Sequence, residues 1–321
     1  MNQHQITVAF IAWAYLHAGA AAFAQSLPRF VSSFGSEGTG PGQFCGHVGI
    51  AIDPMGRVVA ADEGNNRIQV FDVDGTLLMA WGQGGSTDGQ FEAPTAVAVD
   101  ASGFAYVADS ANDRIQKFSA NGHFVKKWGS YCGVPGDGEC SGRFSRMSDI
   151  AVDASAKVYV VEFGNHRVQK FDSEGNFLLK WGTRGNGPGQ FESPLSIAID
   201  AHGDVYVGEF SRVQKFDSDG NFILQWAEPA FCLGTRSGVV YVCANSGCRL
   251  FTSEGVFLTD WRDDDVPVPQ KDERPVYAES IAFDARNNAY LANANRVLKF
   301  TFEPEPIEPT SWSFVKQMYR R

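Results

Sequence analysis

The sequence has no long run of helix-forming residues, and beyond residue 24 it has no apolar stretch long enough to span a membrane. Positive charge is also scarce, because 27 Lys and Arg stand against 37 Asp and Glu, a formal net charge of −10. An acidic surface repels phosphate backbones, so nucleic acid is not expected as a partner. Glycine and aromatic residues are plentiful instead, with 34 Gly, 25 Phe and 7 Trp among 321 residues. This composition is typical of many short strands joined by turns.

Common catalytic motifs are missing as well. The sequence contains no G-x-S-x-G nucleophile elbow, no H-E-x-x-H pair and no phosphate-cradling glycine loop. Its glycines fall between short β-runs, where hairpin turns require positive φ angles. No catalytic residue is predicted from the sequence.

Residues 1–24 have the pattern of a secretory signal peptide. Residues 6–16 are apolar, and Ala22-Phe23-Ala24 forms an A-x-A-like cleavage site before Gln25. The first five residues carry no Lys or Arg, so a retained membrane anchor is the alternative, although the apolar run is short for a span. We expect a secreted or periplasmic protein with no stable membrane insertion after cleavage.

All six cysteines follow the predicted cleavage site, and an even count in an exported chain favours disulfides. Cys132 and Cys140 share one glycine-rich loop, and Cys243 and Cys248 flank one tight turn, so these are the preferred bridges. Cys45 and Cys232 remain. They could pair with each other, or Cys232 could pair with Cys243 as its neighbour across two strands.

One stretch, residues 168–182, recurs along most of the chain. It reads V-Q-K-F, a turn at Glu174-Gly175, and a second β-run that ends in Trp181-Gly182. Copies begin at Ile68, Ile115 and Val213, and copies of one unit indicate a repeat array.

Six repeat units can be aligned. An Asp ends the first strand of most units, and an Arg is assigned to the start of each third strand, at Arg67, Arg114, Arg167, Arg212, Arg249 and Arg296. The sixth unit lacks its final strand, and residues 29–35 resemble that missing strand. We therefore predict an all-β, six-bladed β-propeller over residues 25–302, its ring closed by an N-terminal strand that completes the last blade. Residues 303–321 are predicted to be a C-terminal tail.

Two signatures resemble the NHL repeat: Gly189-Gln-Phe191 followed by Pro194 and Asp200, and the run from Asn165 to Phe171. The resemblance covers residues 29–302 and implies the propeller fold. NHL-type proteins include a peptidyl-hydroxyglycine amidating lyase, sensor domains, RNA- or protein-binding domains and exported bacterial proteins.

The zinc site of that lyase is not carried over. The resemblance places its histidines five residues before the strand-ending Asp, and none of the corresponding residues is His: Val48, Thr95, Ser148, Leu195 and Glu279. His47 is one place away and isolated. The RNA-binding relatives use a basic face, which this acidic chain lacks.

Three features are expected on the face that carries the interblade loops. The first is a pair of long loops, residues 130–141 and residues 262–277, the latter with acidic residues 263–265 that could bind calcium through oxygens. The second is an acid at the end of most second strands, interpreted as the partner of the arginine in the same blade. Where units five and six lose that acid, Arg249 and Arg296 are expected to be freer to meet an anion.

The third feature is the variable residue before each assigned Arg, because repeats can use variable positions for specificity. The candidate ligand-binding residues are His47, Glu63, Asn66, Asp113, Arg146, Phe163, His166, Phe210, Arg249 and Arg296.

Two functions remain open. The favoured one is a binding scaffold that recognises a protein, peptide or small ligand on the face over the central channel. The alternative is a metal-dependent lyase or hydrolase with its site at the channel mouth. No cofactor is predicted, and calcium and zinc are the metals that the carboxylates or histidines could hold.

Overall fold

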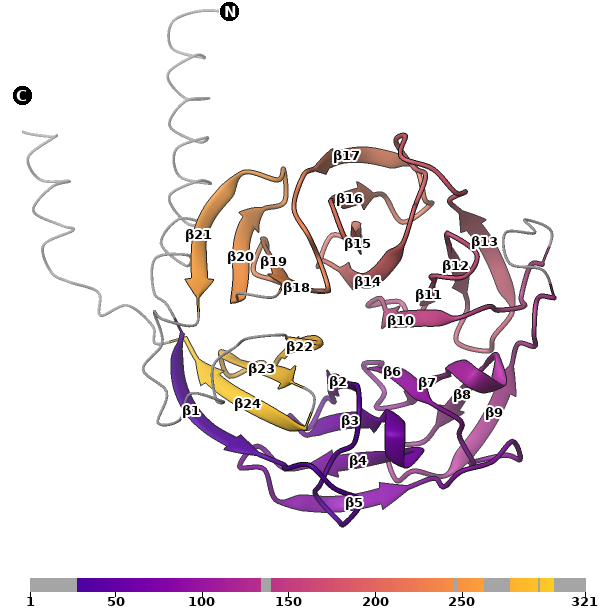
Figure 1. Ribbon diagram of the computed structural model, residues 1–321, viewed down its shortest axis with the longest axis vertical. Helices are drawn as coiled ribbons and strands as arrows, with labels where there is room; N and C mark the ends of the chain where they lie inside the picture. Colours follow the sequence, from indigo (N-terminus) through magenta and orange to yellow (C-terminus); the bar gives the residue numbers. More distant parts are fainter. Residues whose placement is uncertain (1–27, 134–139, 245–246, 263–277, 294, 303–321) are drawn as a thin grey trace, which may run out of the picture.

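A computed structural model describes residues 28–302 except 134–139, 245–246, 263–277 and 294. Within these residues, 24 strands form six antiparallel four-stranded sheets around a central channel (Figure 1). This confirms the predicted all-β, six-bladed propeller. The predicted signal peptide, the acidic loop at 263–277 and the C-terminal tail lie outside the described residues, as does part of the loop at 130–141. None of the described helices is long and apolar enough to cross a membrane.

The strands of each blade follow from the channel outward. Blade 1 contains β2 (Val48–Ile52), β3 (Val58–Asp62), β4 (Arg67–Phe71) and β5 (Leu77–Trp81). Blade 2 contains β6 (Pro94–Val99), β7 (Ala105–Asp109), β8 (Arg114–Phe118) and β9 (Phe124–Trp128). Blade 3 contains β10 (Met147–Val152), β11 (Val158–Glu162), β12 (Arg167–Phe171) and β13 (Phe177–Trp181). Blade 4 contains β14 (Pro194–Ile199), β15 (Val205–Glu209), β16 (Val213–Phe216) and β17 (Phe222–Trp226). Blade 5 contains β18 (Cys232–Arg236), β19 (Val239–Ala244), β20 (Gly247–Thr252) and β21 (Phe257–Arg262). Blade 6 contains β22 (Ser280–Phe283), β23 (Asn288–Asn293), β24 (Arg296–Thr301) and β1 (Arg29–Phe34). Short 3-10 turns, η1 (Glu63–Asn65) and η2 (Ser110–Asn112), follow β3 and β7.

Blade 6 closes the ring with strands from opposite ends of the described chain. β1 pairs antiparallel with β24 (Figure 1), from Arg29 opposite Thr301 to Phe34 opposite Val297. An open array would leave both edges without backbone partners, so this pairing removes the exposed edges of the repeat. The predicted closure is confirmed.

The apolar core lies between neighbouring blades rather than inside any one of them. Between blades 1 and 2, for example, Phe118 contacts the rings of Phe91 and Trp81, at centroid distances of 5.5 and 5.8 Å. Burying such an aromatic side chain contributes about 3 kcal/mol. Each blade is therefore stabilised by its neighbours, as expected for repeats that cannot bury their faces alone.

Turn glycines make this packing possible. Gly122 has a φ of +75°, and a Cβ at that position would lie 2.8 Å from the Trp81 ring of the preceding blade. A larger residue would be strained in its backbone and would collide with the tryptophan.

Two of the cysteine pairs lie at bonding distance. Cys132 joins Cys140 across its loop, and Cys243 joins Cys248 between β19 and β20. Cys45 is an exposed free thiol and Cys232 is a buried one, so these two do not pair with each other.

Candidate functional site

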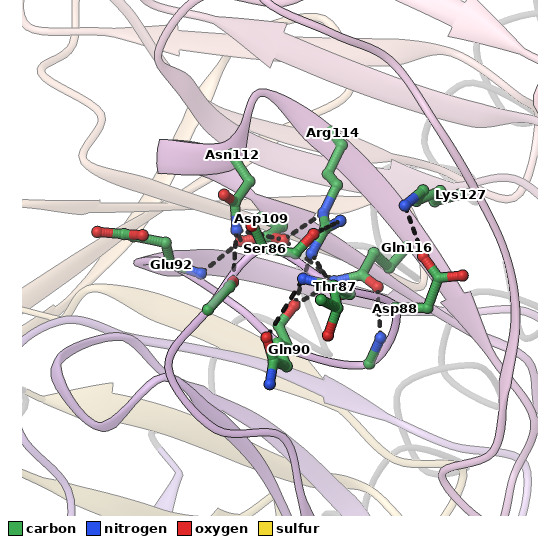
Figure 2. A network of polar contacts seen from close by, with 12 residues as sticks. Ser86, Thr87, Asp88, Gln90, Glu92, Asp109, Asn112, Arg114, Gln116 and Lys127 are labelled. Atoms are coloured by element: carbon green, nitrogen blue, oxygen red, sulfur yellow. Dashed lines mark hydrogen bonds and ion pairs between the residues drawn. The ribbon is translucent and has the colours of Figure 1, made fainter.

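Blades 1 to 4, which we call the regular blades, each have a buried polar network beneath the loop face. Figure 2 shows the network of blade 2. Asp109, at the end of β7, has no exposed surface. Its carboxylate accepts hydrogen bonds from Arg114 Nε at 2.7 Å, from Gln116 Nε2 at 3.0 Å and from Asn112 Nδ2. It also accepts one from the Glu92 backbone N–H at 2.7 Å. Every donor converges on one carboxylate, which the arginine neutralises.

Arg114 also forms hydrogen bonds with the interblade loop at residues 82–93. Its guanidinium donates to the carbonyls of Ser86, Thr87 and Gln90 at 2.6 to 3.0 Å (Figure 2). Gln116 donates to the Gln90 carbonyl as well. The loop is thereby held over the face by side chains of the strand beneath it.

Blades 1, 3 and 4 repeat the pair. The distances are 2.8 Å for Arg67 with Asp62, 2.6 Å for Arg167 with Glu162 and 2.6 Å for Arg212 with Glu209. The four carboxylates are buried and committed to their own blades. As predicted, each acid pairs with the arginine of its own blade. The contacts of these arginines with the interblade loops were not predicted.

The variable position before each Arg has a backbone requirement. Asn66, Asp113 and His166 have φ values of 53°, 51° and 51°. Asn, Asp and His are the non-glycine residues that tolerate this left-handed conformation best. The backbone therefore limits which residues these positions can hold, a restriction that the sequence did not show.

The same position is used differently in blades 1 and 2. Asn66 Oδ1 accepts a hydrogen bond from the Ala93 N–H at 2.8 Å and so supports the next loop. Within the described residues, the Asp113 carboxylate has no hydrogen-bond or ion-pair partner. Burial, and secondarily the charge of Glu162, raise the pKa of Asp113 to about 6.

A hollow of about 650 Å³ opens on the loop face over blades 1 to 3, and we call it the outer hollow. It includes five of the predicted candidates: Glu63, Asp113, Arg146, Phe163 and His166. Its remaining lining comes from interblade loops, from the turns after second strands and, at Thr95, from β6: Ala93, Thr95, Ser110, Ala111, Tyr131, Ser145 and Gly164.

A second hollow of about 480 Å³ lies over the channel, and we call it the channel mouth. All six blades contribute to it: His47, Glu63, Thr95, Ser148, Leu195, Phe210, Phe231, Ala278 and Glu279. Phe210 and Phe231 meet edge to face at 5.6 Å, and Phe210 is 54% exposed. Glu63 and Thr95 line both hollows, which makes them one continuous surface.

His47 and Glu279 meet at the joint between blades 1 and 6. His47 Nδ1 lies 3.7 Å from Glu279 Oε2, and that oxygen accepts a hydrogen bond from the Val48 N–H at 3.0 Å. The carboxylate thus bridges two blades at the rim of the channel mouth.

Asp149 lies deeper, beside a channel cavity of about 210 Å³. Its carboxylate accepts hydrogen bonds from the N–H groups of Ile150, at 2.8 Å, and Ile197 of blade 4, at 2.9 Å. The side chain is partly accessible from the channel but enclosed by strands. This enclosure raises the pKa of Asp149 to about 7, although both amides act to lower it.

Two predicted candidates in blades 5 and 6 do not line either hollow. Arg249 was expected to be free for an anion, and this is wrong: it forms ion pairs with Glu228 and with Asp260, the latter at 3.1 Å. Arg296 lies opposite Asn293 in the ladder. Asn66 lines neither hollow and supports a loop instead.

The assignment of Arg249 to the repeated arginine position is also wrong. In blade 5, Ala244 pairs with Gly247, whereas in blade 1 Asp62 pairs with Arg67. The turn of blade 5 is two residues shorter, so Gly247 takes the arginine position and Arg249 takes that of Gln69. Cys248 consequently does not occupy the variable position either.

Other lining residues were not predicted as ligands. Thr95, Ser148, Leu195 and Glu279 were located through the zinc positions of the lyase and then set aside, although they line the channel mouth. Phe231 and Tyr131 had no repeat signal, since each belongs to a loop of unusual length. Among the described residues, no three His, Cys, Asp or Glu side chains gather as a metal site.

Comparison with known proteins identifies the repeat. The NHL repeat profile matches residues 44–71 and 91–118. Protein lin-41 of Caenorhabditis elegans is 48% identical over 48 residues, 15% of this chain and 4% of that protein. NHL repeat-containing protein 3 of Homo sapiens is 52% identical over 48 residues, 15% of this chain and 14% of that protein. The chain therefore matches only a small part of each relative's length.

Solved structures share the architecture. A gluconolactonase of Xanthomonas campestris superimposes with a TM-score of 0.57 at 15% identity, over 86% of this chain and 97% of its own. A virginiamycin B lyase of Staphylococcus aureus gives 0.56 at 12% identity, over 85% and 99%. At these identities the likeness shows the fold alone.

Proposed function

Because this chain is a six-bladed β-propeller that contains NHL repeats, we propose that it is a binding scaffold that recognises a segment of a protein partner on its loop face. The segment would lie across the outer hollow and the channel mouth. The resemblance to NHL proteins supports a protein partner, and the lyase and lactonase likenesses add only the fold.

The observation that carries this proposal is the continuity of the two hollows through Glu63 and Thr95. A continuous surface with exposed aromatic residues suits an extended chain, which needs pockets for successive side chains. The acid and arginine of blades 1 to 4 are paired with each other, whereas Asp113 has no side-chain partner among the described residues and the Phe210 ring is 54% exposed. Asp113 and Phe210 are therefore available for contact.

We further propose that the protein acts outside the cytoplasm. The two disulfides support this, because such bonds persist in oxidising compartments. The apolar N-terminal segment described in the sequence is the second support.

The test is selection of binders from a phage library of random linear peptides against residues 25–321 produced in an oxidising compartment. Selected peptides are then measured against Phe210→Ser on the loop face and Met55→Ser on the opposite face. Met55 is 71% exposed in the turn after β2, so its replacement is a matched surface control. Peptides that compete with one another and lose affinity only for Phe210→Ser support the proposal.

Two results would overturn it. One is the absence of any selected peptide. The other is a set of peptides whose affinity is unchanged by Phe210→Ser or is lost equally with Met55→Ser.

A further inference from the structure

The charge and apolar surface of the loop face indicate what kind of segment it takes. Resting on the proposed function, we propose that the partner segment carries a basic side chain beside an aromatic or large aliphatic one. The basic group would meet Asp113 and Glu63 in the outer hollow, and the apolar group would pack on Phe210 and Phe231 in the channel mouth.

The charges lining the two hollows are mostly negative. Three carboxylates, Glu63, Asp113 and Glu279, face one guanidinium, Arg146. The protein as a whole carries a net charge of −10, which also favours encounter with a basic segment.

Asp113 is the carboxylate best placed to receive a cation. Its side chain is half-buried and has no hydrogen-bond or ion-pair partner among the described residues. At the same position of blade 1, the Asn66 side chain already accepts a hydrogen bond from the Ala93 N–H. The titratable groups around it are Glu162, whose charge acts on Asp113, and Glu63, Arg146 and His166, which line the same hollow. Burial and Glu162 both disfavour its ionised form, so a ligand cation would relieve a cost already present in the free protein.

The apolar side chain of the segment would bind at a defined place in the channel mouth. Phe210 and Phe231 form an edge-to-face pair, and Leu195 lines the same hollow. An aromatic or aliphatic side chain would cover the exposed Phe210 ring and add favourable aromatic contact. Because Glu63 borders both hollows, the two side chains can belong to one short extended segment.

The experiment uses four defined peptide pools of equal length: Lys with Phe, Glu with Phe, Lys with Ser, and Gln with Phe. Binding to the full chain is followed by fluorescence anisotropy at pH 7.5 and pH 5 and at two salt concentrations. The Lys–Phe pool is expected to bind most tightly, with an affinity that falls as salt increases. Lowering the pH to 5 is expected to weaken it about tenfold, because Asp113 becomes protonated.

Asp113→Asn is the matched variant, since Asn occupies the same left-handed position at Asn66. We expect it to bind the Lys–Phe pool about tenfold less tightly at pH 7.5 and to lose most of the pH dependence. Phe210→Ser should remove the advantage of Lys–Phe over Lys–Ser. Melting temperatures of both variants check that the fold is retained.

The outcomes separate the two proposals. Preferential binding of the Glu–Phe pool, or equal binding of the Gln–Phe and Lys–Phe pools, overturns the basic ligand and leaves the scaffold intact. Equal binding of Lys–Ser and Lys–Phe overturns the apolar half. If no pool binds and phage selection also fails, both the inference and the proposed function fall.

A second inference rests on different residues, the three cysteines of blade 5. Cys232 lies opposite Cys243 in the ladder between β18 and β19, and Cys243 lies opposite Cys248 between β19 and β20. Directly opposed residues of a sheet project from the same face, so the free thiol of Cys232 neighbours the Cys243–Cys248 disulfide.

We infer that this row is a thiol–disulfide exchange site. The Cys232 thiolate attacks Sγ of Cys243, the Cys243–Cys248 bond breaks, and Cys248 leaves as a thiolate that takes up the proton lost by Cys232. No net oxidation occurs and no co-reactant is needed. The exchange would move the covalent tie from the β19–β20 pair to the β18–β19 pair.

Burial raises the pKa of the Cys232 thiol, and the charges of Asp149 and Glu279 raise it further. The thiolate is therefore rare at neutral pH, so exchange is expected to be slow and to accelerate as the pH rises.

Peptide mapping after acid quench and alkylation tests this, with Cys45→Ser as the background. After incubation at alkaline pH, a fraction with free Cys248 and a Cys232–Cys243 bond is expected. Cys248→Ser should hold the Cys232–Cys243 bond in an oxidising glutathione buffer, and Cys232→Ser should hold only Cys243–Cys248. The inference is overturned if Cys232 stays the sole free thiol of blade 5, or if folded Cys248→Ser leaves both remaining thiols free.

Discussion

Blades 2 and 5 occupy equivalent places in the ring but are held together by different chemistry. In blade 2, Asp109 gathers Arg114, Gln116 and the loop amide of Glu92 around one fully buried carboxylate. In blade 5, Ala244 and Gly247 stand where blade 2 has Asp109 and Arg114, so this polar pair is lost. The Cys243–Cys248 disulfide takes the place of the apolar pair Ala108 and Ile115, and Arg249, at the position of Gln116, forms an ion pair with Glu228. The comparison shows that the propeller constrains backbone register and interblade packing more tightly than it constrains the polar residues.

The difference has a cause in loop length. Blade 2 is preceded by the loop at residues 82–93, whose carbonyls need donors, and the network supplies them. Blade 5 is preceded by only residues 227–231 between β17 and β18, so there is little loop to support. The buried arginine is retained where a loop must be held and is absent where it is short.

Removing the central acid of blade 2 should have the largest effect. Asp109→Asn leaves the Arg114 guanidinium buried without a counter-charge, which should cost about 3 to 5 kcal/mol of unfolding free energy. Chemical denaturation measures the loss. A cost below about 1 kcal/mol would mean that the network contributes no more than the Arg249–Glu228 ion pair of blade 5.

Asp149 separates the effect of burial from that of ion pairing, because it is an enclosed carboxylate that, within the part of the chain that the structure describes, has no arginine at hydrogen-bond distance. Its pKa is raised to about 7, so the folded state holds the proton more tightly than the unfolded chain. Stability from this group is fully present below about pH 4, falls as the pH rises to about 7, and is constant above that.

The fall should be no more than about 4 kcal/mol, at 1.36 kcal/mol per pKa unit. Unfolding free energies of wild type and Asp149→Asn, measured from pH 4 to 8, give the contribution as their difference. Parallel curves for the two proteins would contradict the prediction.

Loss of the Cys243–Cys248 disulfide in blade 5 should have the next largest effect on the free energy of unfolding. The Cys243–Cys248 bridge closes a short loop in the unfolded chain, and reduction removes this constraint. A bridge between residues five apart is worth about 2 kcal/mol. The measurement is denaturation with and without reductant in Cys132→Ala/Cys140→Ala, so that only the blade 5 bridge is present. A stability indifferent to reductant would show that blade 5 is held by packing alone.

The smallest effect is expected at the ion pair of blade 5. Arg249 is 45% exposed and keeps Asp260 as a partner, so Glu228→Gln should cost less than about 1 kcal/mol. Added salt should diminish this cost, whereas the cost of Asp109→Asn should persist. A salt-insensitive loss of several kcal/mol in Glu228→Gln would erase the contrast between the two blades.

The repeat pattern allowed the fold to be predicted because strand period, turn residues and closure all point to one ring. The aromatic anchors at Phe171 and Trp181 and the missing strand of the last unit were sufficient for this. The pattern misplaced Arg249, because aligning arginines by residue type conceals a turn shortened by two residues. The register of blade 5 is set by the pairing of β19 with β20, and this pairing cannot be read from a single sequence.

The candidate site was predictable only in part. Asp113, Phe163 and His166 fall in the turns after the second strands of blades 2 and 3, which have the same length as that of blade 1, so their place on the loop face follows from the repeat unit. Phe231 and Tyr131 belong to loops whose lengths depart from the repeat, and their approach to the hollows depends on how those loops fold. The left-handed backbone at Asp113 also explains a residue choice that variability alone assigned to specificity.

The closure between β1 and β24 also sets an order of events during synthesis. β1 is the first described strand to leave the ribosome and β24 is the last, yet they are partners. At about 5 to 20 residues per second, β1 waits roughly 15 to 50 s for its partner. Blades 1 to 5 can assemble in that interval, while the ring stays open until the final strand arrives. A nascent chain interrupted before residue 296 would expose an unpaired edge at the first strand, which is where a chaperone or a second open chain would pair.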